Sequence, residues 1–237
     1  MKKIIFITLV AAFALSACSK EESMGVSTVT TYATMTLNGK AEMFWPLNTP
    51  FVDPGCVAKE GSTDISSKIT STVSDLNVAK GGNYTVEYKV LNGDGFAATT
   101  SRLVHVYDAT APLNGYYQSK IKRDNKGVIG NRGPYTILVF GVGSGNYYVQ
   151  SLLGGWYSIG SGYGDTYAGP GVLKLNADNT FTIVSASKLA WGYPCVFTTG
   201  TTSTYDALTK TIVLNTNMED VPTMKFAVTL NNPTSLN

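Results

Sequence analysis

The sequence has few charged residues and almost no histidine, and both shortages narrow what the protein can do. Only 14% of its 237 residues are charged, and His105 is the single histidine. One histidine excludes any metal site or catalytic motif that needs two. The 18 lysines and arginines barely exceed the 16 aspartates and glutamates, so there is no basic surplus for nucleic acid. We therefore expect no nucleic-acid partner, no metal and no cofactor.

Cysteine is also scarce, whereas aromatic residues and glycine are plentiful. The chain has three cysteines against 14 tyrosines, nine phenylalanines and 24 glycines, and 43% of its residues are hydrophobic. This composition argues against disorder, and the length suits one large or two small domains. Cys56 and Cys195 fall in separate predicted domains, so we expect two buried free thiols rather than a disulfide.

Residues 1–17 have the pattern of a secretory signal peptide. Met1-Lys2-Lys3 is cationic, and the apolar run over 4–15 is too short to span a membrane as a helix. The run ends in Leu15-Ser16-Ala17-Cys18, which resembles a bacterial lipobox. The resemblance implies cleavage before Cys18 and attachment of lipid to its thiol. The alternative is an ordinary signal peptide followed by a chance cysteine.

The residues after the lipobox add a second targeting signal. Ser19-Lys20-Glu21-Glu22 resembles the short export signal on surface lipoproteins of Bacteroidetes-type bacteria. The resemblance implies a protein anchored in the outer membrane by lipid and exposed on the cell surface. The alternative is that residues 18–25 form only a solvated tether, which its charged residues keep extended.

Residues 26–108 show the period-two alternation that is typical of β-strands. Apolar and polar residues alternate over 84–90, and the turn Asn92-Gly93-Asp94-Gly95 leads the chain back toward 102–106. The pattern predicts an antiparallel hairpin with one buried face, within a small sandwich. In the returning strand the valines are expected to point inward, which makes His105 a plain surface histidine.

Three motifs in this region resemble an immunoglobulin-like repeat of bacterial surface proteins. They are Phe51-Val52-Asp53-Pro54-Gly55-Cys56-Val57-Ala58, Gly82-Asn83-Tyr84-Thr85-Val86-Glu87-Tyr88 and Arg102-Leu103-Val104-His105-Val106. The resemblance implies an Ig-like sandwich, which usually serves as a spacer or adhesion module rather than as a catalyst.

Residues 109–113 are predicted to be a linker, because they contain a proline and show no periodicity. Residues 114–237 would then form a second domain, in which no window has helical spacing. Strands are expected near 116–122, 135–140, 147–152, 172–175, 181–186, 210–214 and 224–230. The sequence therefore predicts an all-β protein: an N-terminal Ig-like sandwich followed by a second antiparallel β-sandwich or barrel domain.

The segment 141–171 combines ten of the 24 glycines with a group of aromatic residues. Tyrosine and tryptophan rings suit stacking on a sugar, with nearby polar groups binding its hydroxyls. The candidate ligand-binding residues are Trp156, Tyr157, Tyr163, Asp165 and Tyr167, joined by Trp191 and Tyr193 from a second cluster. The alternative is that these rings fill a barrel core while the glycines make its bends. Both readings stay open, and some rings can do each.

Catalysis lacks the residues it would need. Glycoside hydrolysis normally requires two convergent carboxylates, and Asp165 is the only acid within the aromatic segment. The chain also has no G-x-S-x-G nucleophile motif. We therefore predict no catalytic residue and no enzyme activity.

The second domain carries its own family resemblance. Gly154-Gly155-Trp156-Tyr157, Ala177-Asp178-Asn179-Thr180-Phe181 and Trp191-Gly192 resemble the C-terminal domain of Bacteroidetes outer-membrane lipoproteins of unknown function. Such proteins look like accessory members of glycan-uptake systems, beside a SusD-like lipoprotein and a TonB-dependent transporter. The resemblance implies a non-catalytic surface lipoprotein that binds glycan or assists a polysaccharide-uptake complex. The alternatives are a structural or adhesion lipoprotein with no small ligand, and a glycan-active hydrolase.

Overall fold

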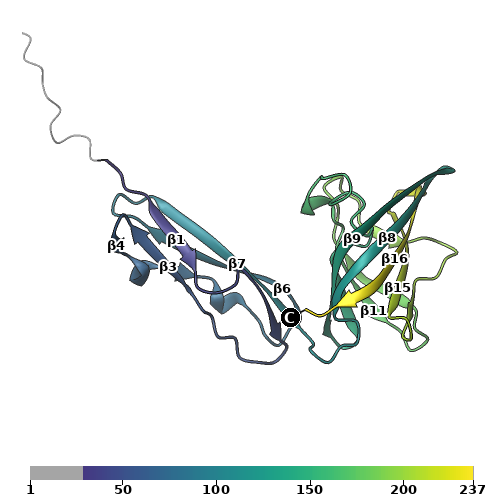
Figure 1. Ribbon diagram of the computed structural model, residues 1–237, viewed down its shortest axis with the longest axis horizontal. Coiled ribbons are helices and arrows are strands. Elements are labelled where there is room, and N and C mark those ends of the chain that lie inside the picture. Colours follow the sequence, from purple (N-terminus) through teal and green to yellow (C-terminus); the bar gives the residue numbers. More distant parts are fainter. Residues whose placement is uncertain (1–28, 237) are drawn as a thin grey trace, which may run out of the picture.

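The computed structural model describes residues 29–236, which fold into two β-rich domains lying end to end (Figure 1). The predicted signal peptide, Cys18 and the export signal Lys20, Glu21 and Glu22 lie outside the described residues. Over 29–236 no helix has the length and apolar character needed to cross a membrane. The only helical elements described are the short 3-10 turns η1 (Ser66–Lys68), η2 (Val73–Asp75) and η3 (Asp165–Tyr167). The predicted all-β class is confirmed.

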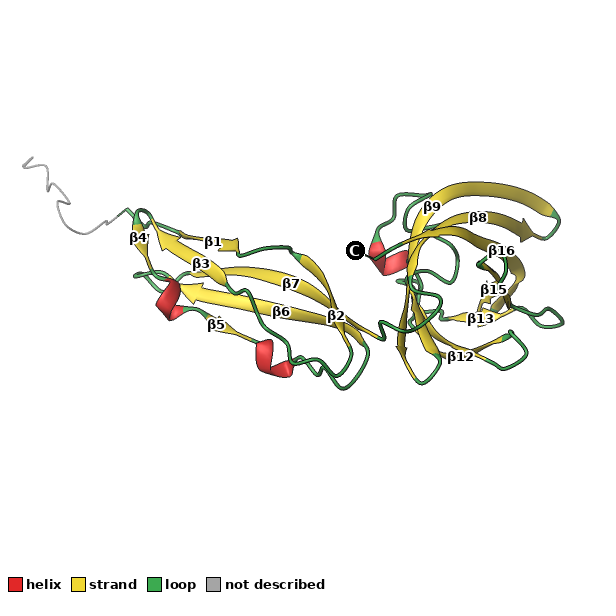
Figure 2. Cartoon of the chain, turned by 60° about the horizontal axis from the view of Figure 1, so that its bottom comes forward, coloured by secondary structure: helices red, strands yellow, loops and turns green. Residues whose placement is uncertain are grey.

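The N-terminal domain is a sandwich of two small sheets (Figure 2). One has the order β1 (Ala33–Leu37), β3 (Cys56–Glu60), β4 (Thr63–Asp64), and the other β2 (Glu42–Pro46), β7 (Ala97–Tyr107), β6 (Gly82–Leu91), β5 (Thr70–Ser71). The alternating faces of β6 and β7 supply the core, where Val86 and Val104 pack against Met35 of the opposite sheet. The strands therefore pair as the period-two pattern requires, with one face of each sheet buried.

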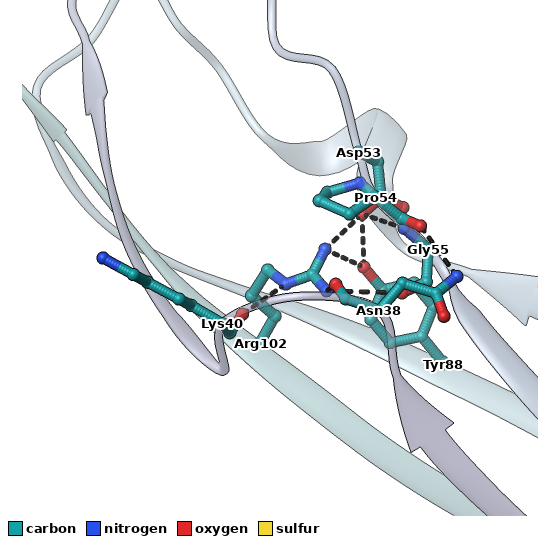
Figure 3. A network of polar contacts seen from close by, with 7 residues as sticks. All are labelled: Asn38, Lys40, Asp53, Pro54, Gly55, Tyr88 and Arg102. Atoms are coloured by element: carbon teal, nitrogen blue, oxygen red, sulfur yellow. Dashed lines mark hydrogen bonds and ion pairs between the residues drawn. The ribbon is translucent and has the colours of Figure 1, made fainter.

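A buried arginine joins the three sequence motifs of this domain (Figure 3). Arg102 is fully buried, and its Nη1 contacts the Asp53 carboxylate at 2.7 Å. The Tyr88 hydroxyl donates to the same carboxylate at 2.5 Å. The remaining N–H groups of Arg102 donate to the Tyr88 hydroxyl and to the carbonyl oxygens of Asn38, Lys40 and Gly55. A guanidinium has five N–H donors, and here all five have acceptors, which offsets the cost of burying the charge.

Removing this arginine is expected to destabilise the domain. Arg102→Met should lower its free energy of unfolding by about 3–5 kcal/mol, because the Asp53 carboxylate loses its counter-charge in a partly buried place. Lys89→Met, which removes an exposed positive charge from the neighbouring strand β6, should change it by less than about 0.5 kcal/mol. Urea denaturation measures both variants. Equal and small effects would contradict the role assigned to Arg102.

The C-terminal domain is one nine-stranded sheet that curls until its edges meet. Its order is β12 (Phe181–Ala186), β11 (Gly171–Leu175), β10 (Asn146–Val149), β9 (Val128–Gly143), β8 (Gly115–Asn125), β16 (Val221–Thr234), β15 (Thr211–Met218), β13 (Cys195–Phe197), with β14 (Thr204–Asp206) also paired to β15. Across the seam, the Phe181 N–H donates to the Ser203 carbonyl at 3.0 Å and the Tyr205 N–H to the Asn179 carbonyl at 2.8 Å. The predicted sandwich or barrel is therefore a nearly closed barrel-like sheet.

The strand predictions for this domain differ from the structure in length and in number. β8, β9 and β16 extend well beyond their predicted ends, and β13 and β14 were not predicted. The two missed strands have three residues each, which is too short for a period-two pattern to stand out. They are ordered because their backbone groups pair with β15.

Both cysteines in the described chain are free thiols, one in each domain. Cys195 is buried in the barrel core, and burial raises its pKa to about 12. Cys56 is half-buried beside the Asp53 carboxylate, and burial raises its pKa as well. Both thiols are therefore protonated at neutral pH and poor nucleophiles.

Aromatic side chains from both domains pack together where the domains meet. The Phe44 ring of β2 stacks on His105, with 4.6 Å between centroids, and meets Tyr116 and Phe140 edge-on at 6.1 and 6.3 Å. The backbones also approach closely, since a Cβ at Gly81 would lie 2.5 Å from the backbone of Val142 in the other domain. The two domains therefore share a packed junction.

His105 lies inside this junction, so its predicted position on the surface is wrong. The residue is 2% exposed, because the C-terminal domain covers the outer face of β7. Its Nδ1 is 2.6 Å from the Asn83 amide oxygen and its Nε2 is 2.7 Å from the Glu42 carboxylate. The alternation correctly turned His105 away from the sandwich core, but it carried no sign of a second domain on that face.

Candidate functional site

The glycine-rich segment between β10 and β11 runs across the inner face of the barrel. Its backbone is held there by hydroxyl groups from two strands: Thr216 Oγ1 of β15 donates to the Leu152 carbonyl at 2.9 Å, and Ser119 Oγ of β8 donates to the Gly154 carbonyl at 2.7 Å. Both hydroxyl residues are fully buried. The segment therefore satisfies its polar backbone groups inside the core instead of facing water.

Glycine is required where this segment approaches the sheet most closely. Gly154 has φ +65°, and a Cβ there would lie 2.7 and 2.8 Å from side chains of β16 and β8. A larger residue would face both an unfavourable backbone conformation and a steric clash. The following residues, Trp156 and Tyr157, can thus enter the core immediately after a tight bend.

Four of the predicted ligand-binding residues form one group of rings, which we call the exposed aromatic cluster: Tyr157, Tyr163, Tyr167 and Trp191. Trp191 is edge-on to Tyr157, with 4.8 Å between ring centroids, and packs against Tyr167, with 4.7 Å between centroids. Tyr163 stacks parallel to Tyr157 at 6.3 Å. Tyr163 is 53% and Trp191 41% exposed, whereas Tyr157 is buried beneath them. The cluster therefore offers two accessible rings on a buried support.

Trp156 lies apart from this surface, in the core. It is 3% exposed and packs edge-on against Phe226 of β16. Two guanidinium groups lie over its ring: the Cζ of Arg123 at 4.6 Å and that of Arg132 at 4.4 Å from the ring centroid. Sequence reasoning singled out neither arginine, although the alternation of β8 puts Arg123 on the same inward face as Ile121. The charge of Arg123 at a position predicted to face inward was the signal that could have identified it.

The remaining two predicted residues also lie outside the cluster. Tyr193 is exposed and has no ring contact with it among the described residues. Asp165, in η3, lines a cavity of about 210 Å³ at the domain junction, together with Glu42, His105 and Tyr148. The structure therefore brings Asp165 toward the N-terminal domain as well as into the aromatic segment.

The junction cavity has acidic and aromatic groups but no free base. Both ring nitrogens of His105 are engaged by Asn83 and Glu42, and its face is covered by Phe44. Burial raises the pKa of the Tyr148 hydroxyl. The volume is also below the range of about 300–1,000 Å³ that is usual for small-molecule pockets. Within residues 29–236 no three potential metal ligands come together.

Tryptophan substitutions separate the core from the surface in this domain. Trp156→Ala is expected to lower the free energy of unfolding by about 3–5 kcal/mol, because it leaves a cavity between the sheet and the segment. Trp191→Ala removes an exposed ring that makes only edge contacts, so a loss of about 1 kcal/mol is expected. Thermal and urea unfolding of the two variants measure the difference. A similar loss in both would mean that Trp191 is part of the core.

Comparison with known proteins assigns a family to each domain. A family model described as a C-terminal domain matches residues 107–232, just over half of the chain. A model for the Ig-like domain of bacterial surface proteins matches residues 35–106, which confirms the predicted Ig-like N-terminal domain. None of the curated proteins that were compared matches the chain.

Among solved structures, the lipoprotein BT2262 from Bacteroides thetaiotaomicron resembles the chain over both domains. It is 29% identical, with a TM-score of 0.63, and the alignment covers 85% of this chain and 100% of that one. A Clostridium perfringens ZmpB structure containing CBM51-2 with GlcNAc and INT domains is 14% identical, with a TM-score of 0.28, covering 87% of this chain and 45% of that one. A Bacteroides ovatus protein of unknown function is 10% identical, with a TM-score of 0.29, covering 62% and 57%. The last two scores are too low to support an inference.

Proposed function

We propose that this chain, which belongs to the family defined by the C-terminal domain, is a non-catalytic surface lipoprotein that binds glycan. The exposed aromatic cluster is the observation that carries the proposal. Trp191 and Tyr163 present apolar rings with polar edges, which is the chemistry that stacks on a sugar ring. Tyr157 supports both rings from below, so their positions are set before a ligand arrives.

The arrangement of the domains supports a surface role. The described chain begins at the end of the N-terminal domain farthest from the C-terminal domain (Figure 1). A lipid on Cys18 would therefore leave the whole Ig-like domain between the membrane and the aromatic cluster. This suits a binding domain held away from an outer membrane, beside a SusD-like lipoprotein and a TonB-dependent transporter.

Loss of one exposed ring should weaken glycan binding without unfolding the domain. For a polysaccharide bound by the wild-type chain, Trp191→Ala is expected to raise the Kd about tenfold, which corresponds to about 1.4 kcal/mol. Tyr32→Ala is the control, since Tyr32 is an exposed ring in the N-terminal domain. Calorimetry with a panel of neutral and acidic polysaccharides measures both. A folded wild-type chain that binds no member of the panel would overturn the glycan proposal.

The lipid anchor and the export signal can be tested in cells. Cys18→Ala is expected to move the protein from the membrane to the soluble fraction, because it removes the thiol that would carry the lipid. Replacing Lys20, Glu21 and Glu22 by alanine should keep the membrane attachment but protect the protein from protease added to intact cells. The wild-type protein should be cut in the same assay. Protection of the wild type would contradict surface exposure.

A further inference from the structure

Arg123 and Arg132 have no acidic partner in the described chain. Over residues 29–236 the only contacts between a basic side chain and a carboxylate are Arg102 with Asp53 and His105 with Glu42. Asp124 follows Arg123 directly, but its carboxylate accepts a hydrogen bond from the Gly127 N–H in the hairpin turn. Two half-buried positive charges therefore lie close to one indole ring without a neighbouring negative charge.

The unsatisfied polar atoms at this place are hydrogen-bond donors. Nε1 of Trp156 and Nε of Arg123 are buried, and neither has an acceptor. Arg132 differs, because its Nη1 donates to the Trp156 carbonyl and to Ser161 Oγ, each at 2.7 Å. Leaving a buried donor without a partner costs about 1–3 kcal/mol, more when the group is charged. A ligand that supplied acceptor oxygens would remove this cost, and an anionic one would also balance the charge.

The arginines adjoin the exposed aromatic cluster through Tyr157. Its hydroxyl lies 3.0 Å from the Met224 sulfur, and Arg123 also hydrogen bonds to it. Burial raises the pKa of this hydroxyl, against the opposing effect of the charges of Arg123 and Arg132. The ring of the same tyrosine supports Trp191 and Tyr163. Tyr157 therefore links the positively charged arginines to the accessible rings of the exposed aromatic cluster.

Local structure indicates that this place is built for the indole and the guanidinium groups together. Arg123 is on β8 and Arg132 on β9, in a hairpin where Arg123 pairs with Gly130. A Cβ at Gly130 would lie 2.9 Å from the Trp156 ring, so only glycine leaves room for the indole there. Attraction between a guanidinium and an indole is worth about 0.5–2 kcal/mol, which keeps the charges near the ring but supplies no acceptor for Nε of Arg123 or Nε1 of Trp156.

We propose that Arg123, Arg132 and the Trp156 indole N–H bind an anionic oxygen group on a sugar, while Trp191 and Tyr163 stack on the adjoining rings. The ligand is thus an acidic glycan, carrying carboxylate or sulfate. This inference rests on the proposed glycan-binding function and narrows its substrate class. Guanidinium groups suit both anions, because their N–H donors match paired oxygens.

The test uses the chain from residue 19 onward, which retains both described domains, with matched polysaccharides. Comparing the affinity for dextran sulfate with that for dextran measures the contribution of sulfate. Comparing polygalacturonate with its methyl ester measures the contribution of carboxylate. The wild-type chain is expected to bind at least one acidic member about tenfold more tightly than its neutral counterpart. Arg123→Met should abolish that preference, whereas Lys122→Met, at the exposed neighbouring position on β8, should retain it. Should Arg123→Met fail to fold, Arg123→Lys replaces it and is expected to reduce the preference.

A second measurement reports on the indole directly. In ¹⁵N-labelled protein, the Trp156 indole N–H resonance should shift on adding sodium galacturonate or sulfate, at constant ionic strength. The Trp45 indole should not shift, because it already donates to the Thr49 carbonyl at 3.0 Å. A shift without polysaccharide binding would overturn the glycan function and keep the anion site. Polysaccharide binding with no preference for charge, and no shift at Trp156, would overturn the anion site and keep the glycan function. If the chain neither bound a polysaccharide nor showed a shift at Trp156, both the glycan function and the anion site would be overturned.

Discussion

The C-terminal domain depends on one constraint: a nine-stranded sheet that curls on itself must fill its concave face. The segment between β10 and β11 meets this need by sending Leu152, Trp156 and Tyr157 inward, with Ser119 and Thr216 satisfying its carbonyl groups. Because the segment must bend sharply to do so, it is rich in glycine. Because it then returns to the surface, its later tyrosines meet Trp191 outside the core. Filling the barrel and placing the candidate site are thus achieved by one stretch of chain.

Arginine side chains in the two domains differ in how completely they are hydrogen-bonded. Arg102 is fully enclosed, and every N–H group that it carries has an acceptor. Arg123 is half-buried, has no carboxylate partner, and leaves its Nε unpaired. A structural arginine is stabilising only when its hydrogen bonds are complete, as they are in the N-terminal domain. The set around Trp156 is incomplete, because Nε of Arg123 and Nε1 of Trp156 have no acceptor among the described residues.

The domain junction links the exposed aromatic cluster to the Ig-like domain. Phe44 and His105 from the Ig-like sandwich pack against Phe140 of β9, which is itself in contact with Tyr148 of β10. The segment that carries Tyr163 starts just after β10. Packing at the junction therefore limits how far the exposed aromatic cluster can turn relative to the N-terminal domain.

The periodicity of the sequence and its turn residues by themselves determined the fold class of this protein. The alternation over 84–90, the turns near 92–95 and 177–180, and the absence of helical spacing sufficed for an all-β chain with a hairpin in the first domain. The three Ig-like motifs of the first domain could also be recognised one by one. Strand patterns depend only on neighbouring residues, so they can be read from the sequence alone.

What only the tertiary structure decided is which side chains share a place. The sequence could not show that Asp53, Tyr88 and Arg102 converge, that a second domain covers His105, or that Trp156 is core while Trp191 is exposed. Nor could it bring Arg123 and Arg132 together on one indole. The physical reason is that alternation states only which face of a strand a residue occupies. Whether that face meets water, another sheet or a returning loop depends on chain segments that are distant in sequence.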